Sequence, residues 1–273
     1  MTPPNRSVRQ ADGTFLFSLG SAEGQHRVKS PPELLTVRTH DDARLDAMLV
    51  WPPDLDSKRR YPVIIEVNGE PRQQIVRNAW DASRALWRRR MAEQGYVTLA
   101  LDCRGSRGHG HRYEEALHYR LGAHEMSDLR DVVDWLRRLP YVDRGRIGIW
   151  GNSPYNAFPA LEAIFTDAGQ FEKAVANSPI LDWKEESAAF VERYLGLPEH
   201  YIDEYEKSSR LEFTNRFTGE LLVLTPDTRT EFAPDLDILR SKLAKTRGSA
   251  QFERTRSRRD LLEQATEFFA RNL

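Results

Sequence analysis

The chain has 273 residues, of which 40% are hydrophobic and 30% charged, and its 40 lysines and arginines nearly balance 41 aspartates and glutamates. This composition is typical of a globular chain with a sizeable core, and it argues against a disordered or membrane-spanning chain. Because the formal net charge is only -1, the composition favours binding neither to nucleic acid nor to anionic lipid.

Cysteine content and the N-terminal residues bear on the compartment. The single cysteine, Cys103, rules out a disulfide within the chain and fits a reducing environment. The first residues lack the apolar stretch of a signal peptide, and no window approaches the roughly 18 consecutive apolar residues of a membrane span. We therefore expect a cytoplasmic protein.

The hydrophobic pattern divides the chain into two parts. Residues 1–30 are polar and interrupted by glycines, and their one apolar run, residues 15–17, is long enough for a single strand, so we expect an N-terminal arm there. From residue 31 to residue 273, short apolar runs alternate with amphipathic stretches. The predicted strands are 34–38, 45–51, 63–67, 97–101, 147–150, 174–176 and 221–224, and the predicted helices are 82–94, 126–139, 157–166, 236–243 and 260–270. This alternation predicts one α/β domain with a mainly parallel sheet and helices on both faces.

One strand-turn-helix segment stands out among these elements. Residues 146–153, Arg-Ile-Gly-Ile-Trp-Gly-Asn-Ser, form a predicted strand that runs into a tight turn with Ser153 at its tip and a helix after it. This is the context of a nucleophile elbow, the turn that presents a catalytic serine. Five further segments accompany it in order: Tyr-Pro-Val-Ile-Ile-Glu-Val at 61–67, Asp-Cys-Arg-Gly-Ser at 102–106, Arg-Leu-Gly at 120–122 with Glu125 and Asp128, Tyr-Val-Asp at 141–143, and Glu-Arg-Tyr-Leu-Gly-Leu-Pro at 192–198.

Together these segments resemble the catalytic domain of the prolyl oligopeptidase and dipeptidyl peptidase family, from about Pro32 to the C-terminus. The resemblance implies an α/β-hydrolase fold. It also implies a β-propeller before this domain, as in well-known members. Residues 1–30 are enough for at most a remnant strand of that propeller, so we expect a member without it.

Hydrolysis in such a fold needs a nucleophile, oxyanion donors, a tight turn, a carboxylate and a base. Ser153 fills the nucleophile position that the resemblance implies. The next residue normally donates its backbone N–H to the oxyanion, but here it is Pro154, which has none. The second donor of the family, a tyrosine hydroxyl, corresponds to Asn68. The final glycine of the G-x-S-x-G motif is replaced by Tyr155, so a relaxed turn is expected.

The carboxylate and the base of the family also lack clear counterparts. After the strand at 221–224 the family register gives Thr228, and a shift of one residue gives Asp227, which is either a triad remnant or a turn residue. The resemblance places Ala250 where the catalytic histidine stands, and no histidine follows His200. Because a histidine base contributes about 10² to 10⁴ in rate, Ser153 is predicted to be an unactivated hydroxyl.

Other reactive groups have simpler interpretations. The four histidines between residues 109 and 124 lack the spacing of a metal site, so no metal is expected, and surface or capping roles are favoured over a base. Cys103 is interpreted as a small buried residue and the basic run 254–259 as a solvated loop. Trp183 and Phe190 correspond to an aromatic specificity pocket of the family, although core packing explains them equally well.

Three hypotheses for the function follow. The first is a member of the family that keeps the fold and binds a small-molecule or peptide-like ligand, or performs non-hydrolytic chemistry, for example in a biosynthetic pathway. The second is an active serine peptidase or esterase with an atypical base, and the third is a non-catalytic partner subunit, for example in a homo-oligomer. None of them requires a cofactor. The residues predicted to line the ligand pocket are Asn68, Asn152, Pro154, Tyr155, Trp183 and Phe190.

Overall fold

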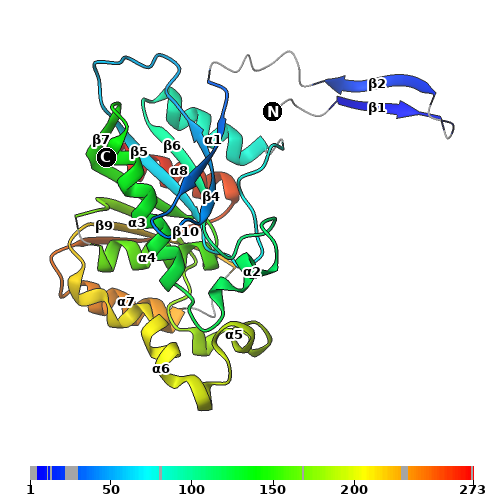
Figure 1. The fold of residues 1–273 in the computed structure, drawn as a ribbon. Helices are drawn as coiled ribbons and strands as arrows, with labels where there is room; N and C mark the ends of the chain where they lie inside the picture. The colour runs from blue at the N-terminus through cyan, green and yellow to red at the C-terminus, as the bar shows by residue number, and fades with distance from the viewer. Residues whose placement is uncertain are drawn as a thin grey trace.

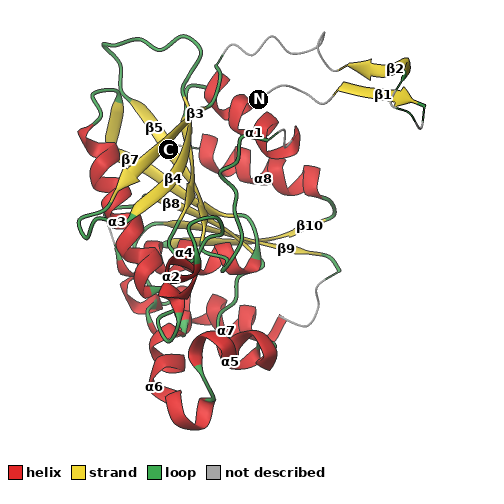
Figure 2. Cartoon of the chain, turned by 45° about the vertical axis from the view of Figure 1, so that its right-hand side comes forward, coloured by secondary structure: helices red, strands yellow, loops and turns green. Residues whose placement is uncertain are grey.

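The computed structural model describes residues 5–10, 12, 14–21, 30–79, 82–167, 169–228, 233–271 and 273. Its centre is an eight-stranded sheet with the strand order β10-β9-β8-β7-β5-β6-β4-β3 (Figures 1 and 2). Two strand pairs, β3 with β4 and β4 with β6, are antiparallel, and the other pairs of this sheet are parallel. The bounds are β3 (Glu33–Arg38), β4 (Arg44–Val50), β5 (Tyr61–Asn68), β6 (Val97–Asp102), β7 (Val142–Gly151), β8 (Lys173–Asn177), β9 (Glu220–Pro226) and β10 (Ser249–Thr255).

Helices cover both faces of this sheet, as expected for buried parallel strands. On one face α3 (Ala123–Arg138), α4 (Pro154–Thr166) and α7 (Ala233–Leu243) bury their apolar side chains, and on the other face α1 (Ala82–Glu93) and α8 (Arg258–Ala270) do so. Successive side chains of a strand point to opposite faces of the sheet and so contribute to the two halves of the core. Val63 and Ile65 of β5 face the first group of helices, whereas Ile64 faces the second. Among the described residues, no helix is long and apolar enough to cross a membrane.

The strands and helices predicted for residues 31–273 are all present, within a few residues at their ends. The arm differs from the prediction, because it carries two strands, β1 (Asn5–Arg9) and β2 (Phe15–Ser21), which pair in a separate antiparallel sheet. The sequence also missed β10, an edge strand with the polar sequence Ser-Ala-Gln-Phe-Glu-Arg-Thr that pairs with β9 alone. Three further helices were not predicted: α2 (His111–Glu114), α5 (Ala188–Leu195) and α6 (Pro198–Ser208).

Parallel strands place their carboxyl ends at one edge of a sheet, and ligands of such folds bind there. The turn after β7, the loop after β5 and the loops after β8, β9 and β10 share this edge, because these strands are neighbours in the sheet. The segments that carry the predicted nucleophile, the second oxyanion donor and the carboxylate therefore meet at one edge of the domain.

Candidate functional site

The turn between β7 and α4 holds the predicted nucleophile in an unstrained conformation. A Cβ on Gly151 would lie 2.2 Å from the backbone oxygen of Asn156, so the close return of the chain requires glycine at that position. Ser153 has φ -160° and ψ 167°, which is extended backbone and not the strained turn of a nucleophile elbow. Pro154 is the first residue of α4, where a missing N–H costs no helical hydrogen bond.

The hydroxyl of Ser153 acts as the N-cap of α4. Its Oγ accepts a hydrogen bond from the backbone N–H of Asn156 at 3.3 Å, which satisfies one of the free donors at the start of the helix. Within the described part of the chain, neither a histidine nitrogen nor a carboxylate is hydrogen-bonded to this hydroxyl. The serine is therefore held by its own helix.

The side chain of Asn156 occupies the backbone donors of the loop after β5. Its Oδ1 accepts hydrogen bonds from the N–H groups of Gly69 and Glu70, each at 3.0 Å. In α/β hydrolases the equivalent loop donates an N–H to the oxyanion. Because Asn156 is only 3% exposed, these two N–H groups are satisfied inside the protein by a buried carboxamide oxygen. Asn156 was not among the predicted site residues, although it lies only three positions after Ser153.

The side chain of Asn68, the predicted second donor, is also hydrogen-bonded within the protein. Its Nδ2 donates to Oδ1 of Asp102 at 2.8 Å and to the carbonyl oxygen of Gln73 at 3.1 Å. The same aspartate accepts the N–H groups of Ile75 and Val76, both at 2.9 Å, and its burial raises the pKa of the Asp102 carboxyl. Asn68 thus fixes the loop after β5, and the structure does not bring it to Ser153 as a donor.

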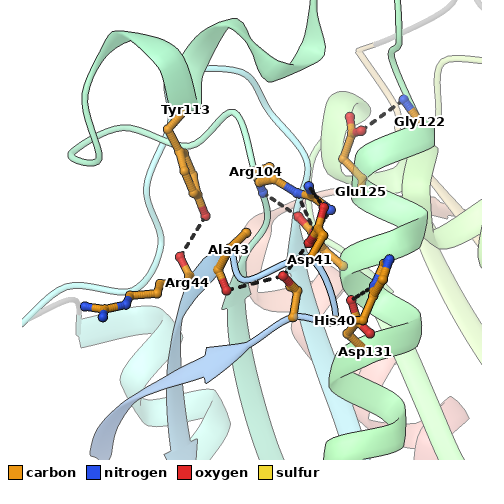
Figure 3. Close-up of polar contacts among 11 residues, drawn as sticks. His40, Asp41, Ala43, Arg44, Arg104, Tyr113, Gly122, Glu125 and Asp131 are labelled. Atoms are coloured by element: carbon orange, nitrogen blue, oxygen red, sulfur yellow. Dashed lines mark hydrogen bonds and ion pairs between the residues drawn. The ribbon is translucent and has the colours of Figure 1, made fainter.

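A buried acidic group supports the same loop from α3. Figure 3 shows Glu125, whose Oε2 accepts the N–H of Gly122 at 3.1 Å. Burial raises the pKa of Glu125 to about 8. A Cβ on Gly69 would lie 3.7 Å from Cγ of Glu125, so the carboxyl side chain packs directly beside the loop. The loop after β5 is therefore bordered by a carboxyl group whose neutral form is favoured by burial.

A network of ion pairs follows β6. Nε of Arg104 lies 2.8 Å from Oδ1 of Asp128. Its Nη1 lies 2.6 Å from Oδ2 of Asp41 (Figure 3). Burial raises the pKa of Asp128 to about 6, although Arg104 opposes the shift. Cys103, the residue before Arg104, is fully buried, and burial raises the pKa of its thiol well above the ordinary value. This agrees with the interpretation of Cys103 as a small buried residue.

One cluster near this network has a composition that metal sites share. His40, Asp41 and Asp131 place one ligand atom each within 4.8 Å of one another. Nδ1 of His40 lies 2.9 Å from Oδ2 of Asp131, and the hydrogen bond to this carboxylate raises the pKa of the histidine (Figure 3). Because Arg104 already pairs with Asp41, we interpret the cluster as part of the ion-pair network. The other histidines with ion-pair contacts, His109 and His111, lie beside carboxylates of their own.

Three predicted pocket residues form a packed aromatic group. The ring of Tyr155 lies 5.9 Å from the ring of Trp183 and 4.6 Å from that of Phe190, measured between centroids. The Trp183 and Phe190 rings are stacked at 6.2 Å. Trp183 is only 2% exposed and also packs on Phe158. The structure therefore brings these predicted residues together, but as mutually packed rings, with Tyr155 where the family motif has glycine.

An open pocket of about 300 Å³ lies on the other side of the turn, at the carboxyl ends of β7 to β10. Two of the predicted site residues, Asn152 and Asp227, line it. Asp227 follows β9 and is exposed, its N–H donates to the carbonyl oxygen of Thr255 at 3.0 Å, and its carboxylate makes no hydrogen bond to Ser153. The lining residues are Arg84, Asn152, Asn177, Pro226, Asp227, Thr228, Thr255, Arg256, Ser257, Arg258 and Leu261.

The position predicted for the lost base needs correction. Ala250 is the second residue of β10 and pairs with Leu221, near the beginning of β9. In a parallel sheet the site lies at the carboxyl ends, so a base would have to follow Thr255, the last residue of β10. Arg256 and Ser257 occupy that loop and α8 begins directly after them. Ala250 was placed wrongly because the polar edge strand β10 was not predicted, so the position of the short loop after it was not recognised.

Comparison with known proteins identifies the relatives of this arrangement. The model of the prolyl oligopeptidase family matches residues 83–247. Dipeptidyl peptidase 8 of Homo sapiens is 29% identical over 192 residues, which cover 70% of this chain and 21% of the relative. Prolyl endopeptidase FAP of Bos taurus is 27% identical over 220 residues, 78% of this chain and 28% of the relative. The crystal structure of Porphyromonas gingivalis dipeptidyl peptidase 4 superposes with a TM-score of 0.85 at 25% identity, over 100% of this chain and 40% of that one. The chain therefore spans well under half the length of these relatives.

Proposed function

This chain belongs to the prolyl oligopeptidase family, and we propose that it is a member without serine-hydrolase activity that uses the carboxyl edge of its sheet to bind a small-molecule or peptide-like ligand. The observation that carries the proposal is the side chain of Asn156. This side chain accepts the N–H groups of Gly69 and Glu70, and the backbone N–H of Asn156 donates to Ser153, so one residue fixes both the loop after β5 and the hydroxyl of the predicted nucleophile.

Rate arguments support this proposal. Loss of a single oxyanion donor costs on the order of 10² to 10³ in rate, and Pro154 has no N–H to donate. A missing histidine base costs about 10² to 10⁴ more. The loop after β10, where a base would be carried, holds only Arg256 and Ser257, and a guanidinium does not lose its proton at neutral pH. Ser153 is then an ordinary alcohol.

The open pocket supports a ligand at this edge. The aromatic group of Tyr155, Trp183 and Phe190 is packed against itself, whereas the pocket beside Asn152 has a volume of about 300 Å³, at the lower end of the range of small-molecule sites. A ligand held there could be bound or converted without an acyl-enzyme, and a biosynthetic role would need only shape and a few polar groups.

The direct test is the reactivity of Ser153. Folded protein is treated with a fluorophosphonate probe and, separately, with a p-nitrophenyl ester, beside Ser153→Ala and a known serine hydrolase as a positive control. We expect no labelling of Ser153 and ester turnover equal in the wild type and Ser153→Ala. Labelling that disappears in Ser153→Ala, together with turnover that this variant abolishes, would overturn the proposal in favour of an active hydrolase.

A second variant tests the role given to Asn156. Asn156→Gly removes the carboxamide and leaves the N–H groups of Gly69 and Glu70 open to a substrate. Because no base is gained, we expect this variant to remain unlabelled by the probe. Labelling of Asn156→Gly but not of the wild type would show that the carboxamide alone suppresses an otherwise competent serine, and the proposal of a lost base would then be wrong.

A further inference from the structure

The short connection between β10 and α8 concentrates basic residues at the open pocket. Thr255, Arg256, Ser257 and Arg258 all line it. Ser257 caps α8, because its Oγ accepts the N–H of Asp260 at 3.2 Å. The positive end of a 13-residue helix therefore borders the same pocket as two guanidinium groups.

This arrangement is unfavourable for the helix itself. Acidic residues stabilise the first turn of a helix and basic residues destabilise it. Here Arg258 and Arg259 are the first two residues of α8 and Arg256 precedes its cap, with Asp260 as the one acidic residue of the first turn. Arg256 and Arg258 are exposed, so apolar burial does not require them. Residues that oppose the stability of their own helix are expected at functional sites.

The remaining walls of the pocket add further polar groups. Arg84, on α1, lines it and lies 3.6 Å from Glu66. The carboxamides of Asn152 and Asn177 approach from the ends of β7 and β8, and Nδ2 of Asn177 lies 3.5 Å from the carbonyl oxygen of Asn152. Asp227 is the one acidic residue among the lining residues, against three arginines. Arginines therefore outnumber carboxylates among the residues that line the pocket, although Arg84 pairs with Glu66 and Arg256 lies 3.8 Å from Asp260.

The backbone beside the pocket is also strained. Ser178, directly after Asn177, has φ 52°, in the left-handed region that residues other than glycine rarely adopt. Its Oγ lies 3.2 Å from Oδ1 of Asn177, so the strained residue holds the carboxamide of its neighbour. Strain of this kind persists only where the surrounding structure fixes it.

From these observations we propose that the pocket binds an oxyanion, the carboxylate or phosphate group of a small ligand, with Arg256 and Arg258 as the groups that recognise it. A planar guanidinium matches both oxyanions through two parallel hydrogen bonds, and the volume of about 300 Å³ restricts the ligand to a small molecule or the end of a peptide. The inference rests on the proposed function and names the ligand class of the same edge of the sheet.

The test measures binding of two probes, inorganic phosphate and acetate, to the whole chain by isothermal titration calorimetry. Ionic strength is kept constant with sodium chloride, because exposed charges are screened by salt. We expect saturable one-site binding of at least one probe. The preferred probe identifies the source of the oxyanion: tighter phosphate binding indicates a phosphorylated ligand, and tighter acetate binding indicates a carboxylate such as a peptide C-terminus.

Three variants locate the site. Arg256→Gln and Arg258→Gln each remove one guanidinium from the pocket, and each is expected to weaken binding of the preferred probe by about tenfold. Arg259→Gln is the matched control, because it removes the same charge from the same helical turn, whereas the Arg259 side chain pairs with Glu263 and lines a neighbouring groove outside the pocket. It should leave the affinity within about twofold.

The outcomes separate this inference from the function on which it rests. Binding of neither probe, or equal losses in Arg258→Gln and Arg259→Gln, would overturn the oxyanion site and leave only a diffuse basic surface. Neither result changes the expected inertness of Ser153, which the fluorophosphonate probe reports independently. Labelling of Ser153, in turn, would overturn the proposed function whatever the calorimetry shows.

Discussion

The two sides of the turn at Ser153 differ in whether their polar groups are hydrogen-bonded within the protein or exposed. On the β5 side, the loop at residues 68–76 is closed by the protein's own polar side chains, with Asn156 and Asp102 each accepting several backbone N–H groups. On the β9 and β10 side, the pocket is open and its polar residues Asp227, Arg256 and Arg258 are exposed.

This difference implies that the polar groups of the closed side stabilise the fold, whereas those of the open side are available for binding. A buried polar group must be hydrogen-bonded, since an unsatisfied one costs about 1–3 kcal/mol, so the closed side is fixed by energetic need. Exposed groups on the open side contribute little to folding. They are therefore available to a ligand. At the same edge of the sheet, the loop after β5 therefore has a structural role, and the residues after β9 and β10 are available to bind a ligand.

The largest expected effect compares one aspartate from each side. Asp102→Ala leaves the side chain of Asn68 and the N–H groups of Ile75 and Val76 without their acceptor, and we expect a loss of about 3–5 kcal/mol in the free energy of unfolding. Asp227→Ala, whose carboxylate is exposed, should cost less than about 0.5 kcal/mol. Urea denaturation of both variants measures the difference. Similar losses would mean that the two sides are not distinct.

The next effect is a dependence of stability on pH that belongs to the closed side. Glu125 is fully buried with a pKa of about 8, against an ordinary value of 4.5. Its neutral form is favoured in the folded state, so this contribution is fully present below pH 4.5 and is lost as the pH rises through 8. Between pH 5 and pH 8 the wild type should lose roughly 2–4 kcal/mol from this group.

Glu125→Gln makes that side chain neutral at every pH, and the decline should become correspondingly smaller. Glu267→Gln, an exposed position on α8, is the control and should follow the wild-type profile. Chemical denaturation at several pH values provides the comparison. An unchanged slope in Glu125→Gln would show that Glu125 is ionised in the folded protein.

A smaller effect is expected for Asn156, which satisfies two backbone N–H groups of the loop after β5. Asn156→Ala removes the acceptor of the Gly69 and Glu70 N–H groups and should lower the free energy of unfolding by about 1–3 kcal/mol. Asn156→Asp keeps an acceptor oxygen and should be closer to the wild type. If the alanine variant is as stable as the wild type, another group or water satisfies these donors.

The smallest expected effect is a change in ligand affinity on the open side of the turn. Asp227 is the one carboxylate among the residues that line the pocket, and it opposes an anionic ligand. Asp227→Asn should strengthen binding of the preferred oxyanion probe by about two- to fivefold at constant ionic strength. Weaker binding in this variant would show that Asp227 positions the site through its own charge instead of opposing it.

Much of the fold could be predicted from the sequence, because hydrophobic periodicity reports burial directly. The regular alternation after residue 31 predicted the parallel sheet, and Pro154 with Tyr155 predicted a relaxed turn at Ser153. The edge strand β10 could not be predicted, since half of its surface faces solvent and its residues are polar. Misplacing Ala250 was a consequence of missing that strand.

The sequence by itself determined the fold family, the position of Ser153 and the absence of a histidine after His200, because these are properties of residue order and type. Only the tertiary structure decided that Asn156 accepts a hydrogen bond from the N–H of Glu70, 86 residues away in the chain. The tertiary structure also decided that Arg256 and Arg258 line the same pocket as Asn152. Such contacts depend on which strands become neighbours in the sheet. Strand order is set by the packing of the whole core, and no local pattern of residues records it.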